Sequence, residues 1–151
     1  MNMTPDRVPS ADWDLIHELA VEIANADKEE EEARYRARLL EYLEVLERKY
    51  GAIPSILATR ADYVDDINTR RNLLQQAFRA ARDRSDHHNE LLIASSLSQL
   101  EIEISKDIVE GEKWLKAFEE ALGGHEDEFE KWEFKRLTSL LEAIREDSKQ
   151  G

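Results

Sequence analysis

The sequence predicts an all-α fold built from antiparallel helical hairpins. Apolar residues recur three and four positions apart along most of the 151 residues, and this spacing places them on one face of a helix. The chain has five glycines and three prolines, so few turns interrupt the regular structure. An apolar pattern also repeats after 40 residues, and a period in this range is typical of helical-repeat arrays.

The repeat relates residues 53–81 to residues 93–121. The matched residues are Ile53 with Ile93, Leu57 with Leu97, Val64 with Ile104, Leu74 with Trp114, Ala77 with Ala117, Phe78 with Phe118, and Ala81 with Ala121. Each copy therefore predicts a helix, a short turn and a second helix. Neighbouring hairpins of this kind bury each other's apolar faces, and their arrays present extended surfaces that bind other proteins.

Two further helices precede the repeat. Ser10 is expected to cap the first helix, which follows a flexible, proline-containing arm over residues 1–10. The second helix begins in the acidic run 28–32, because acidic side chains favour the positive end of a helix dipole. It ends at Gly51, with Pro54 just beyond, in the order expected of a C-cap and a helix breaker.

Turn and capping residues divide the rest of the chain into further helices, for a total of about seven. The dividing residues are Pro54 at the start of the third helix, Asp66 as N-cap of the fourth, the turn 86–89 before the fifth, and Gly123 and Gly124 after the sixth. The last helix, over about 126–146, is expected to cap the open end of the array. Residues 11–147 are thus expected to form a single helical-repeat domain.

The fifth helix is expected to be apolar on two sides. Four apolar residues share one face and two lie nearly opposite: Ile93, Leu97, Leu100 and Ile104, against Leu91 and Ile102. A helix with two apolar faces fits between two neighbours, which is the place of an interior helix in an array.

The chain carries a net charge of -13. This charge disfavours nucleic acid and anionic membranes as partners, because phosphate groups are bound by clustered Lys and Arg. It favours a basic protein partner, which such a field attracts rapidly at low salt. The alternative is that the charge serves solubility alone.

The sequence predicts a cytoplasmic protein. It contains no cysteine, which excludes disulfides, thiolate nucleophiles and Cys-ligated zinc and fits a reducing compartment. The N-terminus lacks the basic start and apolar run of a signal peptide. No apolar stretch approaches the length of a membrane span.

No constellation of residues predicts an enzyme, a metal site or a cofactor site. His87 and His88 are adjacent, so on a helix they point about 100° apart and cannot chelate one ion. His125 precedes a run of acids that suits a helix start. A Gly-rich phosphate loop and a strand-turn-helix nucleophile are both missing from the sequence. A buried carboxylate pair in a deep pocket would support an enzyme as a third class of function.

Arginine dominates the fourth helix of this acidic protein. The five residues are Arg70, Arg71, Arg79, Arg82 and Arg84. They are expected either to clamp an acidic segment of a partner or to pair with the acidic second helix. The alternative is an outer face whose charges are compensated locally, since exposed ion pairs are common and weak.

A polar strip is the candidate partner-binding site. The apolar face of the fifth helix leaves Ser95, Gln99 and Glu103 facing away from the core, and the 40-residue offset relates them to the third helix. The complete strip is Ser55, Thr59, Asp62, Tyr63, Ser95, Gln99 and Glu103. Hydroxyl, amide and carboxylate groups on rigid helices suit the recognition of a peptide or a protein surface. The alternative is ordinary solvated surface.

Residues 35–122 resemble a tetratricopeptide-repeat protein. The segment 114–122 is similar to the second helix of such a repeat, with Trp114, Phe118 and Ala121 on its packing positions. The segment 49–63 is similar to the entry into a repeat, with Ala61 where two helices approach closely. The resemblance implies a right-handed, tetratricopeptide-like array of antiparallel hairpins whose first helices line a concave groove. Members of this family are adaptors, co-chaperones and scaffolds.

The leading functional hypothesis is a protein-binding module that does no chemistry. Small acidic helical-repeat proteins occur as immunity proteins beside bacterial toxins, and the resemblance implies that this chain covers the active site of a basic cognate toxin. Tyr63 is expected to serve as an aromatic anchor. The alternative is an adaptor or chaperone that holds an extended peptide in the groove. A toxin face would bury a broad area, whereas a peptide would bury the groove strip alone.

Overall fold

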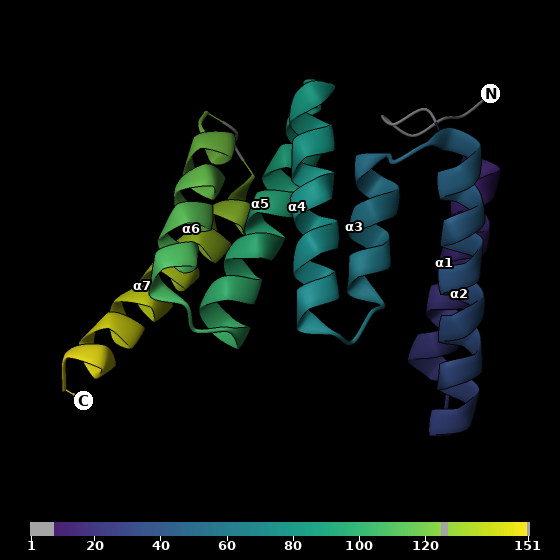
Figure 1. Cartoon of the computed structure of the whole chain (residues 1–151), viewed down its shortest axis with the longest axis horizontal. Helices are drawn as coiled ribbons and strands as arrows, with labels where there is room; N and C mark the ends of the chain where they lie inside the picture. Colours follow the sequence, from purple (N-terminus) through teal and green to yellow (C-terminus); the bar gives the residue numbers. More distant parts are fainter. Residues whose placement is uncertain (1–7, 125–126, 151) are drawn as a thin grey trace. The chain divides into compact units, whose positions relative to one another are not determined.

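The computed structural model describes residues 8–124 and 127–150, and every regular element in these ranges is helical (Figure 1). The elements are α1 (Ser10–Asn25), α2 (Glu29–Tyr50), α3 (Pro54–Asp62), α4 (Ile67–Asp83), α5 (His87–Gln99), the π-helical turn η1 (Leu100–Ile104), α6 (Ile108–Leu122) and α7 (Glu128–Gln150). The prediction of an all-α protein with about seven helices is confirmed. The predicted arm up to residue 7, together with His125, lies outside the described residues.

The chain divides into two compact units, Met1–Ala80 and Ala81–Gly151, and each is described by itself. The boundary falls inside α4, between Ala80 and the buried Ala81. Because the predicted array requires both units, the arrangement of the hairpins as a continuous tetratricopeptide-like array stays a prediction.

The first unit is organised around the hairpin of α1 and α2. Its core contains Val8, Ile16, Leu39, Leu43, Leu46, Ile53 and Ile56. The same hairpin has a polar contact between its two helices. The Asp12 carboxylate on α1 accepts hydrogen bonds from two tyrosines on α2, and we call these three residues the Asp12 clamp. The hydroxyls of Tyr42 and Tyr50 each lie 2.7 Å from a different oxygen of Asp12.

Predicted caps and breaks account for most of the helix ends in this unit. Gly51 ends α2 with φ 91°, a left-handed conformation that glycine adopts without strain. Asp66 accepts a hydrogen bond from the backbone N–H of Thr69, which confirms it as the N-cap of α4. The expectation for Ser10 is wrong, because Pro9 occupies the N-cap position of α1 and Ser10 is the first helical residue.

The second unit packs α5 against both α6 and α7. Its core includes Leu97 of α5, Phe118 of α6 and Leu137 of α7, each fully buried. The ring of Phe118 meets that of Phe134 edge to face, with centroids 5.6 Å apart. The burial of both Leu91 and Ile93 confirms that α5 is apolar on two sides. Asp86 caps α5 through the N–H of Asn89, so the expected turn 86–89 is instead the start of this helix.

The π-helical turn η1 corrects one predicted core position. The N–H of Ser105 donates to the carbonyl of Leu100 at 2.9 Å, which is the i to i−5 bond of a π-helix. This wider turn changes the register of the last residues. Glu101 is only 1% exposed, whereas Ile104, which was expected in the core, is 47% exposed.

Candidate protein-binding surfaces

The first half of the predicted strip lies on α3 in the first unit. Ser55 and Thr59 are half-buried, and the Thr59 hydroxyl donates to the carbonyl oxygen of Ser55 at 2.7 Å. Asp62 is exposed and Tyr63, which follows the helix, is half-buried. Burial and the neighbouring Asp62 carboxylate raise the pKa of the Tyr63 hydroxyl, so this side chain is a neutral, amphipathic group at ordinary pH.

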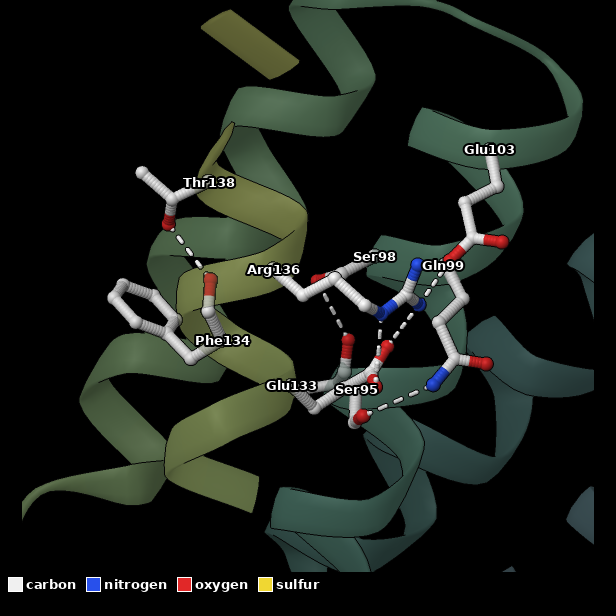
Figure 2. Close-up of polar contacts among 9 residues, drawn as sticks. Ser95, Ser98, Gln99, Glu103, Glu133, Phe134, Arg136 and Thr138 are labelled. Carbon is white, nitrogen blue, oxygen red and sulfur yellow. Dashed lines mark hydrogen bonds and ion pairs between the residues drawn. The ribbon is translucent and has the colours of Figure 1, made fainter. Parts of the chain in front are cut away.

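In the second half of the strip, Ser95 does not face away from the core as expected, whereas Gln99 is half-buried and Glu103 is exposed. Ser95 is 4% exposed, and its hydroxyl bonds to Glu130 of α7. The side-chain amide of Gln99 donates to the Ser95 hydroxyl at 3.5 Å, and Glu103 is ion-paired with Arg136 (Figure 2). The expectation for Ser95 is therefore wrong, because α7 covers this side of α5.

The two halves of the strip belong to different units, so their continuity stays a prediction. Within each half, the hydrogen bonds and the ion pair described above join residues of the same unit. Asp62 and Glu103 are the exposed carboxylates of the strip. These two residues are therefore its most accessible members.

An ion-pair network joins α7 to η1 in the second unit. The Arg136 guanidinium binds the carboxylates of both Glu133, three residues earlier, and Glu103 (Figure 2). Glu133 is buried, and Arg136 is partly buried. Hydrogen bonds to the two carboxylates raise the pKa of Arg136, so the guanidinium stays charged at any ordinary pH.

Glu130, one turn before Glu133, has a different environment. It is 5% exposed, and its Oε2 atom has no hydrogen-bond partner among the residues that the structure describes. Burial raises the pKa of this carboxyl, and the hydrogen bond from Ser95 opposes the shift. The sequence spacing is consistent with both buried acids, because Glu133 lies three residues after Glu130 and four residues before the buried Leu137, which places all three on one face of the helix.

These buried acids lie apart from two hollows on the surface of the second unit. Two surface hollows border α7, with volumes of about 440 and 310 Å³. Neither Glu130 nor Glu133 lines either hollow. Within the described residues, no group of three or more His, Asp or Glu side chains has the geometry to hold a metal ion.

Part of the outward face of α7 is apolar, although a capping helix is expected to be polar there. Phe129 is 65% exposed and Trp132 is 57% exposed, and their ring centroids lie 6.2 Å apart. Leu140 continues the exposed row, and the Arg136 guanidinium lies 5.9 Å from the centre of the Trp132 ring. We call Phe129, Trp132 and Leu140 the α7 stripe. All three residues lie within the predicted last helix, but their helical spacing does not indicate which face is turned outward.

The outward face of α1 is acidic. Asp14, Glu18 and Glu22 are exposed and follow one another at intervals of four residues, so they form one row along the helix. The segment Ser10–Asn25 contains no Lys or Arg. Val21 and Leu15 are exposed on the two borders of this row. We call the five residues the acidic face of α1.

Comparisons with known proteins add no relative. No protein-family model matches the chain, and neither a curated protein nor a solved structure matches it. Within residues 8–124 and 127–150, no helix combines the length and the apolar character required to cross a membrane.

Proposed function

We propose that this protein is a binding module of the immunity type, which neutralises a basic protein by covering its active site. The observation that carries this proposal is the acidic face of α1. Its three carboxylates repel one another along the helix at a cost of roughly 0.2–0.5 kcal/mol per neighbouring pair, and no cation on α1 offsets that cost. A basic partner surface would convert this repulsion into attraction.

The exposed apolar residues on the same helix complete the surface. Leu15 and Val21 border the carboxylates, so a partner could bury apolar area between its own Lys or Arg contacts. The net charge of -13 would accelerate encounter with such a partner at low salt. Neutralisation would follow from steric occlusion, and the chain itself would perform no chemistry.

A capture experiment with two matched variants tests this proposal. The first variant carries Asp14→Asn, Glu18→Gln and Glu22→Gln, which remove the carboxylates of the acidic face. The control carries Glu41→Gln, Glu119→Gln and Glu120→Gln, which remove the same number of exposed charges from α2 and α6. Each tagged chain is incubated with an extract of the source cells at low and at moderate salt, and bound proteins are identified by mass spectrometry.

The proposal predicts one stoichiometric basic protein that the wild type and the control retain at moderate salt and the α1 variant loses. Inhibition of that protein's activity by the wild-type chain would support neutralisation as the function. Many unrelated proteins, captured equally by both variants and all released by salt, would contradict it. An extended peptide whose capture depends on Tyr63 and not on α1 would instead support an adaptor.

A further inference from the structure

We propose that α1 opens and closes against α2 as one unit, with the Asp12 clamp as the latch that keeps it closed. The first observation is the sparse burial of α1. Within Ser10–Asn25, Ile16 is the single buried residue, whereas the shorter helix α5 buries seven. Three further apolar residues of α1 are only partly buried against the core. Because apolar burial supplies most of the stability of a docked helix, α1 is held weakly.

The ends and the charges of α1 add little to its stability. Pro9 occupies the N-cap position without a side-chain hydrogen bond, and no Lys or Arg lies in the last turn of the helix. The carboxylates of the acidic face repel one another, and Glu22 lies at the C-terminal end, where the helix dipole is negative. An isolated helix of 16 residues is marginally stable in water even without such repulsion. We therefore expect α1 to lose its helical structure when it leaves α2.

The Asp12 clamp opposes this opening. The hydroxyls of Tyr42 and Tyr50 reach the two carboxylate oxygens of Asp12 across the hairpin, each at 2.7 Å. Asp12 lies in the first turn of α1 and both tyrosines lie on α2, so the two bonds form only while α1 is docked. Hydrogen bonds to a charged group are stronger than those between neutral groups. For a helix with a single buried residue, the two bonds are a large part of what opening must break.

The latch bears on partner binding, because Asp14, Glu18 and Glu22 form one row only while α1 is helical. The opening itself is independent of the proposed function, whereas this consequence rests on it. A partner that binds the row selects the closed form, and its apparent affinity falls with the fraction of chains that are open. Tyr42 and Tyr50 therefore act through α1, as positioning residues for the acidic face.

Hydrogen exchange of the free full chain tests the opening without any partner. Exchange of single amides is followed by NMR at urea concentrations well below the unfolding transition. The amides of residues 14–25 are expected to converge on one opening free energy that is lower than that of residues 39–46 of α2. It should also depend less on urea, because opening of α1 exposes less surface than unfolding of the whole unit. Convergence of α1 with α2, or gradual fraying from one end of α1, would overturn the proposal.

Tyrosine variants test the latch in the same experiment. Tyr42→Phe combined with Tyr50→Phe keeps both rings beside the core and removes both hydrogen bonds, and is expected to accelerate exchange in α1 roughly tenfold to thirtyfold. The control is Tyr35→Phe, which removes a half-buried hydroxyl from α2 outside the clamp and is expected to leave exchange in α1 unchanged. Equal exchange in the wild type and the double variant, or equal acceleration by the control, would overturn the assignment of the clamp as the latch.

Discussion

Glu130 and Glu133 are both buried on α7, three residues apart, yet only Glu133 contacts a guanidinium. Arg136 binds Glu133, whereas Oε2 of Glu130 has no partner among the described residues. A buried charge is tolerated when it is paired and is costly when it is not. The two carboxylates are therefore expected to have opposite effects on the stability of the second unit.

The first prediction follows from this contrast. Glu130→Gln is expected to raise the free energy of unfolding by about 1 kcal/mol, because it removes an incompletely paired buried charge. Glu133→Gln is expected to lower it by about 1 kcal/mol, because Arg136 loses its buried partner while solvent screens part of the loss. Urea denaturation of both variants measures the signs. Destabilisation by both substitutions would mean that Glu130 is better solvated than its burial indicates.

The second prediction concerns the pH dependence of the Glu130 effect. Burial raises the pKa of Glu130 in the folded chain above its ordinary value of 4.5, so the folded state holds this proton more tightly than the unfolded state. The associated stability is complete below pH 4.5 and is lost as pH rises through the folded pKa. The advantage of Glu130→Gln over the wild type is therefore expected to grow from pH 4 to pH 8. A constant difference across this range would contradict the assignment.

The third prediction concerns the Asp12 clamp of the first unit. Tyr42→Phe and Tyr50→Phe each remove one hydrogen bond to the carboxylate, at a cost of about 1 kcal/mol. The double variant should cost less than the sum of the single changes if the surviving tyrosine compensates in part. Thermal unfolding of the three variants measures these costs. Unchanged midpoints would show that solvent replaces both bonds without loss.

Titration of the clamp gives a fourth prediction, on the alkaline side. Burial and the Asp12 carboxylate raise the pKa of Tyr42 from 10.0 to about 12. Stability from this group is fully present below pH 10 and is lost as pH rises toward 12. On the acid side, the tyrosine hydrogen bonds lower the pKa of Asp12 below 3.8, so its contribution is lost only as pH falls through that lowered value. Absorbance at alkaline pH is expected to show that Tyr42 forms its phenolate at a higher pH in the wild-type chain than in the Asp12→Asn variant.

The fifth prediction concerns the contact between α6 and η1. A Cβ atom added at Gly111 would lie 2.9 Å from Cγ1 of Ile102, which is fully buried. Gly111→Ala is therefore expected to lower stability by about 1–3 kcal/mol, despite the better helix propensity of alanine. Gly124→Ala is the control, because an added Cβ there meets nothing within 4 Å. Equal stability of the two variants would show that α6 shifts away from η1 at little cost.

The helical fold was largely predictable from the sequence, because its determinants are local. Gly51, Asp66 and the apolar spacing of α2 each act within one or two turns of a helix. The π-helical turn was not predictable in this way. A constant rotation of 100° per residue placed Ile104 in the core, and the wider turn of η1 exposed it and buried Glu101 instead.

The candidate site was harder to predict because it depends on packing between helices. Ser95 and Gln99 are polar, so their sequence positions favoured solvent, yet α7 supplies Glu130 as a buried partner for Ser95. The same limitation hid the α7 stripe. Phe129 and Trp132 satisfy helical spacing with either face turned inward, and only the buried Leu137 and Leu141 decide which face packs.

Hydrogen exchange of the captured complex is the most direct test of the proposed binding function. Backbone amides of α1 are measured in the free chain and in the chain bound to its basic partner, at the same pH and salt. The proposed function predicts that partner binding slows exchange in residues 10–25 by more than in any other helix. Unchanged exchange in α1, with protection confined to α3 or α7, would contradict the assignment of the acidic face as the interface.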